Sequence, residues 1–308
     1  MLCLRRISTQ RTTVCSKTFI KQPSKIICGG FLRSVSNQSF ALAHENYEAN
    51  AGQNEGSPIL VIHGMLGWKK NWHTFCKSYS EHTGKQMIAV DCRNHGESMR
   101  SDYMTYPLMA GDIAETLKQL RIPKTILIGH SMGGKVAMET ALSMPGIVGK
   151  LILVDITPIP ASTKTGTVSM VPMVLPAMIN LDLTQVKSRK DADELLKDSI
   201  PLDDLRAWVL TNLFKDKKGQ FSWHVNVSSV QENKETLFDG IMLNDRQPYA
   251  GETLFIGGGE SDVLRNVDMN EMRKMFPNAQ LEMIPGAGHF VHADKPKEFL
   301  ETVKNFLR

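Results

Sequence analysis

The sequence places one serine between two glycines, directly after a run of apolar residues. In "ILIGHSMGGKVAM" (126–138) the spacing G-x-S-x-G sets Ser131 between Gly129 and Gly133. A serine hydroxyl is a weak nucleophile at neutral pH and needs a base within hydrogen-bond reach. A sharp turn from strand to helix would expose its oxygen, and such a turn leaves no room for a Cβ on the flanking residues. The pattern predicts a nucleophile, provided that a base and an acid follow along the chain.

A candidate base lies far downstream, in "IPGAGHF" (284–290). His289 follows a Gly-Ala-Gly turn after an apolar stretch, and it comes 158 residues after Ser131. Serine nucleophiles on this kind of turn have their partners in the chain order Ser, Asp, His. We therefore expect His289 to take the proton from Ser131 and to give it to the leaving group.

Two carboxylates satisfy that chain order. Asp155 ends the apolar run "KLILVD" (150–155), and Asp262 follows the next apolar run in "GGGESDV" (257–263). Either side chain would orient the imidazole and stabilise its charged form. The residues alone leave both possibilities open.

An oxyanion hole needs two backbone N–H groups aimed at one point. One should come from Met132, the residue after the nucleophile. The other should come from Met65, in the "HGMLG" turn (63–67) that follows the first apolar run. Both methionines would act through their backbones.

These residues need a parallel sheet to position them. Apolar runs predict strands over 57–64, 124–129, 150–158 and 251–259, a strand that runs into a loop over 86–98, and a further strand within 271–290. Patterns of helical period separate them, most clearly over 106–122, 133–144 and 295–307. Strands that alternate with helices are typical of an α/β fold with a mostly parallel central sheet flanked by helices.

The interval from about 158 to 250 breaks this alternation. It is richer in Met, Pro, Ser and Lys, and its helical patterns have no buried strands between them. We interpret it as a helical cap inserted between two core strands. The expected organisation is therefore one domain over 40–308 that carries this cap.

The first residues of the chain have a different composition. Residues 1–44 hold seven of the 36 Lys and Arg residues and no acid, so 29 basic and 32 acidic side chains remain in residues 45–308. A basic leader rich in Ser and Thr predicts a mitochondrial targeting presequence over 1–36. The remaining domain is slightly acidic, which argues against nucleic-acid binding. No apolar run reaches the length of a transmembrane helix.

The sequence contains no dinucleotide-binding loop, phosphate-binding loop or metal-ligand spacing. Cys76 and Cys92 are the cysteines outside the leader, and they suggest neither a disulfide framework nor a metal site. We expect no cofactor and no metal.

Four motifs together resemble the alpha/beta-hydrolase superfamily: "HGMLG", "DCRNHGES", "GHSMGG" and "GAGH". The resemblance covers roughly residues 40–308. The stretches "VDITPIP", "WVLTNLFKDKKGQFSWHVNV" and "GAGHFVHADKP" are similar to one branch, the mitochondrial alpha/beta-hydrolase domain-containing protein eleven and its bacterial short-chain esterase relatives.

The resemblance implies hydrolysis of carboxylic esters, with acylglycerols or short acyl esters as substrates. It also implies a location in the mitochondrial matrix and an association with the 2-oxoglutarate dehydrogenase complex. In the bacterial relatives the acid lies on the strand after the nucleophile helix, which corresponds to Asp155. Members of this branch often lack an Asp at the position of Asp262, so the resemblance favours Asp155.

Two alternative functions remain. A thioesterase or an amidase would use the same triad, because the sequence does not separate leaving groups. A hydrolase-fold binding protein of a mitochondrial complex would require no catalysis, but such a protein is expected to have lost the serine, the histidine or the elbow glycines, and all are present.

Overall fold

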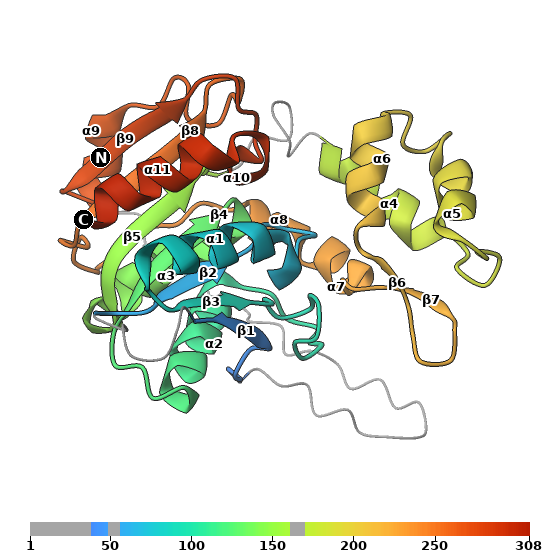
Figure 1. Cartoon of the computed structure of the whole chain (residues 1–308), viewed down its shortest axis with the longest axis horizontal. Helices are drawn as coiled ribbons and strands as arrows, with labels where there is room; N and C mark the ends of the chain where they lie inside the picture. Colours follow the sequence, from blue (N-terminus) through green and yellow to red (C-terminus); the bar gives the residue numbers. More distant parts are fainter. Residues whose placement is uncertain (1–37, 49–55, 161–169) are drawn as a thin grey trace, which may run out of the picture. The chain divides into compact units, whose positions relative to one another are not determined.

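The fold is built on a seven-stranded sheet (Figure 1). The computed structural model describes residues 38–48, 56–160 and 170–308, so the predicted presequence lies outside the described residues. The strand order is β1-β3-β2-β4-β5-β8-β9, in which β1 runs antiparallel to β3 and every other neighbouring pair is parallel. The strands are β1 (His44–Tyr47), β2 (Ile59–Ile62), β3 (Met87–Val90), β4 (Thr125–His130), β5 (Val148–Val154), β8 (Thr253–Gly258) and β9 (Ala279–Ile284).

The central strands are buried on both faces, and their side chains alternate between two cores. Leu127 packs into one core while its neighbours Ile126 and Ile128 pack into the other, as the two-residue period of a strand requires. The first core holds α2 (Tyr106–Gln119), α3 (Met132–Ser143) and α9 (Met269–Met275) against the sheet. The second holds α1 (His73–Thr83) and α11 (Pro296–Leu307). This arrangement confirms the predicted fold class.

Between β5 and β8 the chain leaves the sheet. It forms the helices α4 (Val171–Asn180), α5 (Arg189–Leu196), α6 (Asp203–Leu210), α7 (Val227–Glu232) and α8 (Lys234–Phe238). It also forms a short antiparallel hairpin of β6 (Leu213–Lys215) and β7 (Phe221–Trp223), which the helical patterns did not anticipate. We call the segment 170–250 the cap.

Hydrogen bonds fasten the base of the cap to loops of the sheet. Asn94 donates its side-chain amide to Ser229 on α7, and the Asn212 side chain donates to the carbonyl of Leu66. The hydroxyl of Tyr106 donates to the carbonyl of Leu237 on α8. Because each bond is buried, the end of the cap nearest the sheet is held in a defined position.

Several elements are too short for the hydrophobic periodicity of the sequence to predict them. The strand β1 has four residues, and the 3-10 turn Lys69–Trp72 that leads into α1 interrupts any helical period. The helix α10 (Val291–Asp294) is a single turn next to His289. Elements of this length are shorter than one window of a period analysis, so tertiary contacts decide them.

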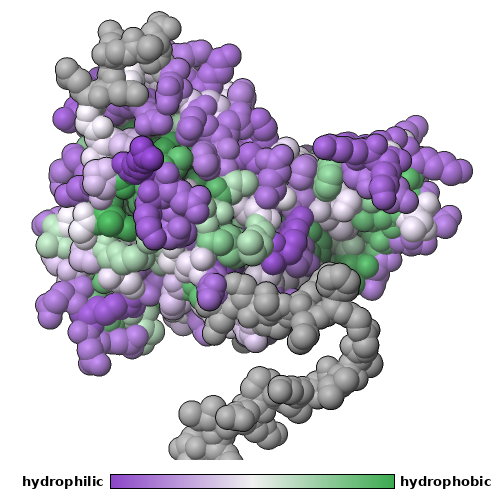
Figure 2. All heavy atoms as spheres, turned by 90° about the horizontal axis from the view of Figure 1, so that it is seen from below, coloured by the Kyte–Doolittle hydropathy of each residue, from purple (hydrophilic) through white to green (hydrophobic). Residues whose placement is uncertain are grey.

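The surface is mostly hydrophilic on the face shown in Figure 2, with apolar side chains in separate small groups. Among the described residues, no helix combines the length and the apolar character that crossing a membrane would require.

Candidate active site

Ser131 lies at a strained turn between β4 and α3. Its backbone has φ 51° and ψ −121°, a left-handed conformation that residues with a side chain rarely adopt. The Ser131 N–H donates to the carbonyl of Val154 at 3.0 Å, which ties the turn to the end of β5. Strain of this kind persists only where the surroundings enforce it, and it occurs often at functional sites. Ser131 therefore lies at the carboxyl end of the sheet, where ligands bind in open α/β folds.

The two glycines beside Ser131 are required by close backbone contacts. A Cβ on Gly129 would lie 2.3 Å from the carbonyl oxygen of Gly133, and a Cβ on Gly133 would lie 2.4 Å from the carbonyl oxygen of Ile62. These atoms belong to the backbone and have no freedom to move aside. The G-x-S-x-G spacing thus allows α3 to start immediately beside β2 and β4.

His289 lies in the loop between β9 and α10 and pairs with Asp155. Its Nδ1–H donates to Asp155 Oδ2 at 2.7 Å. Asp155 is fully buried just beyond the end of β5, with a left-handed φ of 47° that turns its carboxylate towards the histidine loop. The hydroxyl of Ser261 also donates to Oδ2, at 2.6 Å. These two donors hold the Asp155 carboxylate in one position, and the carboxylate fixes the orientation of the imidazole.

Asp262 is not part of this arrangement. Its side chain is 60% exposed and forms an ion pair with Arg265 at 3.4 Å. The neighbouring Ser261 faces inward instead and donates to Asp155. The geometry therefore brings Asp155, and not Asp262, to His289.

The turn after β2 lies against Ser131. A Cβ on Gly64 would lie 3.2 Å from Ser131 Cβ, so the two segments are in close contact. The N–H of Gly67 donates to the carbonyl of Gly64 at 3.0 Å and closes the turn. Within the described residues, the N–H groups of Met65 and Met132 have no hydrogen-bond partner.

Two buried histidines hold that turn in place. His63 Nδ1–H donates to the carbonyl of Gly64 at 2.7 Å, and its Nε2 accepts from the N–H of Cys92. His95 Nε2 accepts from the N–H of Leu66 at 3.3 Å. Burial lowers the pKa of His63 and lowers that of His95 to about 3, so both rings are neutral at pH 7 and keep these donor and acceptor roles.

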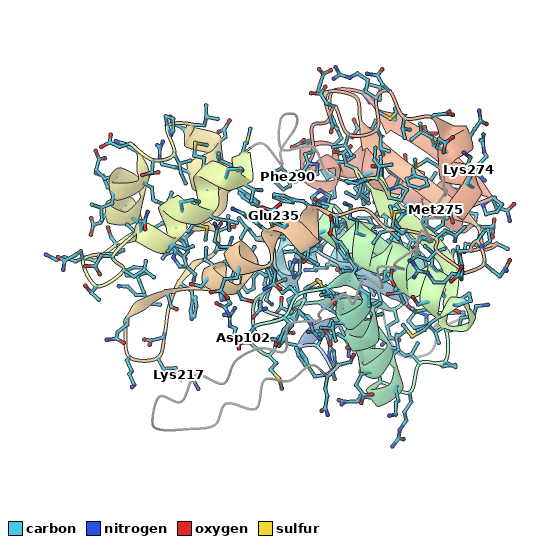
Figure 3. All side chains as sticks on the ribbon, turned by 180° about the vertical axis from the view of Figure 1, so that it is seen from behind. Asp102, Lys217, Glu235, Lys274, Met275 and Phe290 are labelled. Atoms are coloured by element: carbon cyan, nitrogen blue, oxygen red, sulfur yellow. The ribbon has the colours of Figure 1, made fainter. Side chains whose placement is uncertain are left out.

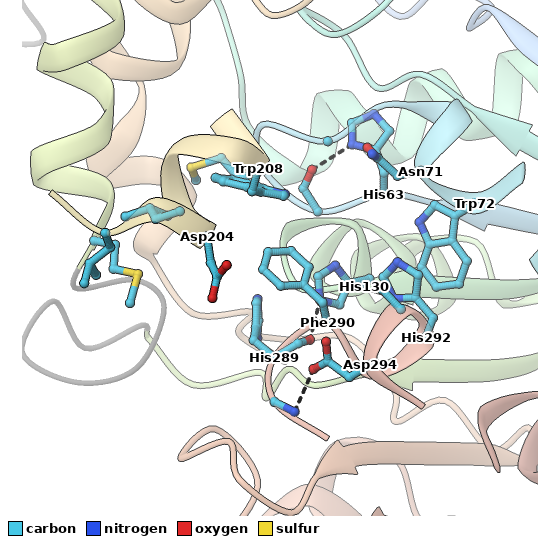
Figure 4. Close-up of a pocket in the computed structure, with 18 of the residues that line it drawn as sticks. His63, Asn71, Trp72, His130, Asp204, Trp208, His289, Phe290, His292 and Asp294 are labelled. Carbon is cyan, nitrogen blue, oxygen red and sulfur yellow. Dashed lines mark hydrogen bonds between the residues drawn. The ribbon is translucent and has the colours of Figure 1, made fainter. Parts of the chain in front are cut away.

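His130, the residue before Ser131, connects the Ser131 turn to the loop that holds His289. Its Nε2–H donates to the carbonyl of His289 at 2.9 Å (Figure 4). Next to it the ring of His292 stacks on Trp72, with 3.9 Å between the ring centroids. Burial lowers the pKa of His130 and lowers that of His292 to about 3. No function was expected for His130 from the sequence, although its position inside the G-x-S-x-G motif could have indicated one.

Two cavities meet at His289. A small one of about 70 Å³ contains Ser131 and Met132 and is walled mainly by apolar side chains of α4, α8 and the sheet loops. A larger one of about 820 Å³, shown in Figure 4, opens on the other side between the sheet loops, α6 and α10. Phe290 (labelled in Figure 3) and Trp208 line both cavities, and the centroids of their rings are 5.5 Å apart.

Among the described residues there is no hydrogen bond between the Ser131 hydroxyl and the imidazole of His289, although both side chains line the small cavity. Such contacts often tighten only when substrate binds. No group of three or more His, Cys, Asp or Glu side chains in the described part of the chain is arranged to hold a metal ion.

Comparisons with known proteins agree with this geometry. A model of the alpha/beta hydrolase fold matches residues 57–296. The sn-1-specific diacylglycerol lipase ABHD11 of Danio rerio is 37% identical over 286 residues, which cover 91% of this chain and 89% of that protein. Esterase YbfF of Escherichia coli is 29% identical, with 85% and 98% covered. Among solved structures, a marine microorganism esterase is 32% identical, covers 87% of this chain and 100% of its own, and has a TM-score of 0.81.

Proposed function

The chain belongs to the alpha/beta-hydrolase family, as its motifs predicted, and on this basis we propose that it is a serine hydrolase that cleaves carboxylic esters through an acyl-enzyme on Ser131. Its relatives include proteins named as esterases and as a diacylglycerol lipase. The observation that carries the proposal is the 2.7 Å hydrogen bond from His289 to the buried Asp155, beside a serine on a strained turn.

In the proposed mechanism, His289 removes the proton from the Ser131 hydroxyl as its oxygen attacks the ester carbonyl. The Nδ1–H bond to Asp155 stabilises the imidazolium that forms. The N–H groups of Met65 and Met132 bind the negative charge on the carbonyl oxygen. His289 then protonates the leaving alcohol, and the ester C–O bond breaks. Water activated by the same imidazole releases the acid and restores Ser131.

The two cavities suggest where the two halves of an ester bind. Because Ser131 lines the small cavity, we place the acyl group there. The larger cavity borders His289, which must reach the leaving oxygen, so we place the alcohol there. A small acyl cavity beside a roomy alcohol cavity supports short acyl esters, including those of glycerol. The same triad would serve a thioester or an amide, so matched ester, thioester and amide substrates are the comparison that separates these activities.

Active-site labelling tests the proposal directly. We expect a fluorophosphonate probe to modify Ser131 in the purified chain, and peptide mass spectrometry identifies the adduct. Labelling should disappear in Ser131→Ala and in His289→Ala, whereas the exposed His82→Ala serves as the matched control and should be labelled like the wild type. A folded protein that takes no label, or takes it elsewhere, would make the hydrolase-fold binding protein the better interpretation.

The cellular setting is proposed on the resemblance alone. We place the protein in the mitochondrial matrix after removal of a presequence within residues 1–36, with a role in lipid metabolism and an association with the 2-oxoglutarate dehydrogenase complex. A reporter fused to residues 1–45 tests the location, and a reporter that stays outside mitochondria would reject it. Co-purification of the complex with Ser131→Ala, compared with the wild type, tests whether the association is independent of catalysis.

A further inference from the structure

A buried lysine lies in the same cavity as the proposed nucleophile. Lys135 follows Ser131 by four residues on α3, so its side chain starts from the same helix face one turn further on. It is 2% exposed, although lysine is almost never fully buried without a partner. Lys135 and Ser131 both line the small cavity.

The charge of Lys135 is not neutralised by an ion pair within the described residues. Its Nζ donates to the backbone carbonyl of Asp239 at 2.6 Å and reaches that of Phe238 at 3.5 Å, just past the end of α8. It also lies 5.9 Å from the centre of the Tyr106 ring. The Asp239 carboxylate acts on it only through space. Carbonyl dipoles satisfy hydrogen bonds, but a buried cation without a counter-ion still attracts an anion strongly.

The remaining lining of the cavity suits an acyl chain. Among the described residues that line it, Lys135 and His289 are the titratable ones besides Tyr106, and most of the others are apolar: Met65, Leu66, Ile156, Val171, Val174 and Leu237 are among them. An acyl group on Ser131 would occupy a cavity that these apolar side chains and Lys135 line together. The low volume of about 70 Å³ restricts the chain to a short one.

We propose that Lys135 is a specificity-determining residue that binds a carboxylate at the far end of the acyl group. The preferred substrates are then half-esters of short dicarboxylic acids. This inference rests on the proposed function, because it assumes that an acyl group occupies the Ser131 cavity. Hydrolysis adds one water across the ester bond, releasing the alcohol and the free dicarboxylate, and Lys135 takes no part in bond making.

Pairs of esters that differ only at the far end test the inference. Monoethyl succinate is compared with ethyl 4-methylpentanoate, and monoethyl glutarate with ethyl 5-methylhexanoate, so that an isopropyl group replaces the carboxylate at similar size. The measured quantity is the ratio of kcat/KM for the half-ester to kcat/KM for its neutral counterpart, followed by ethanol release. We expect the full-length wild type to favour at least one half-ester by about tenfold, as one hydrogen bond to a charged group provides.

The variants separate recognition from packing. Lys135→Met keeps the length and the apolar stem, and Lys135→Gln keeps a donor for the Asp239 carbonyl without the charge. Both should lower the ratio to one or below. Lys150→Met is the matched control, because Lys150 also donates to a backbone carbonyl, that of Phe306, and lies outside both cavities. Its ratio should stay at the wild-type value.

Each outcome has one meaning. A wild type that favours the neutral ester in both pairs would overturn the inference. If Lys135→Met and Lys135→Gln lowered kcat/KM equally for both esters and left the ratio unchanged, Lys135 would serve only to anchor the end of α8. That result would also overturn the inference. A folded wild type that hydrolyses no ester in either pair and takes no fluorophosphonate label would instead reject the proposed function, and this inference would fall with it.

Discussion

The two cavities that meet at His289 have opposite electrostatic character. The small one around Ser131 has Lys135 as its charged residue and apolar walls. The large one is lined by Asp203, Asp204 and Asp294, and none of its described lining residues is Lys or Arg. The three other histidines that line the large cavity are neutral at pH 7, since burial lowers the pKa of each.

The acyl group and the alcohol of an ester would therefore be recognised by different physical interactions. A short acyl group is selected by a buried ammonium in a low-dielectric cavity, where one charge acts strongly. An alcohol is received by an open cavity whose carboxylates lie near solvent and are screened. We therefore expect strict selection on the acyl side and broad tolerance on the alcohol side.

Removing a group that the reaction needs, whichever ester is bound, should abolish hydrolysis altogether. In Ser131→Ala or His289→Ala, no acyl-enzyme can form, and kcat should fall by about a million-fold for every ester, as for other serine hydrolases. Steady-state hydrolysis of one short acyl ester measures this. Residual activity within about tenfold of the wild type would assign the chemistry to other residues.

The choice of acid should produce the next largest effect. Asp155→Asn removes the charge that stabilises the imidazolium and disturbs the imidazole tautomer, so kcat should fall by about ten-thousand-fold. Asp262→Asn should change kcat by less than about twofold, because that side chain is exposed and pairs with Arg265. The two variants are compared on the same ester, and the reverse order of losses would move the triad acid to Asp262.

A substitution that reshapes one cavity should change the preference for either the acyl group or the alcohol, but not both. Leu237→Ala enlarges the small cavity, so the preference should shift towards longer acyl chains by about tenfold, at a stability cost of about 2–4 kcal/mol. Ala293→Trp narrows the large cavity and should reduce kcat/KM for glycerol esters relative to methyl esters by about tenfold. A matrix of acyl and alcohol lengths measures both. If either variant changed both preferences alike, the assignment of acyl and alcohol to separate cavities would be wrong.

The smallest expected effect is a pH dependence of acyl selectivity. Burial lowers the pKa of Lys135 to about 8, partly opposed by Asp239, so the ammonium that attracts a carboxylate is present below that pH and is lost above it. The kcat/KM ratio of half-ester to neutral ester should therefore fall several-fold as pH rises through about 8.

The ratio isolates Lys135 from the other titratable groups near it. Both esters need His289 equally, so its titration cancels from the ratio of their kcat/KM values. Burial raises the pKa of Tyr106, which keeps its hydroxyl neutral in this pH range. Lys135→Met should make the ratio independent of pH. A wild-type ratio that stays constant between pH 6 and 10 would contradict this account.

Much of the core could be predicted from the sequence because its signals are local. The apolar runs that became β2, β4, β5 and β8 are continuous, as strands buried on both faces must be. The strand, glycines and helix around Ser131 are adjacent in the chain, so the turn follows from neighbouring residues. The cap hairpin and α10 were missed, since they are short and depend on contacts with distant segments.

The sequence alone was enough to predict the class of fold, which the sheet confirms, and to propose Ser131 as nucleophile with its partners in the chain order Asp, His. Only the tertiary structure shows which carboxylate faces His289, because Asp155 lies 134 residues away from it, and the two meet since β8 pairs with β5 on one side and with β9 on the other. It also decided that Lys135 is a buried cation beside Ser131, since burial depends on α8 covering that face of α3. The turn at Ser131 follows from residues that are neighbours in the chain, whereas the surroundings of the Lys135 charge depend on segments that only folding brings together.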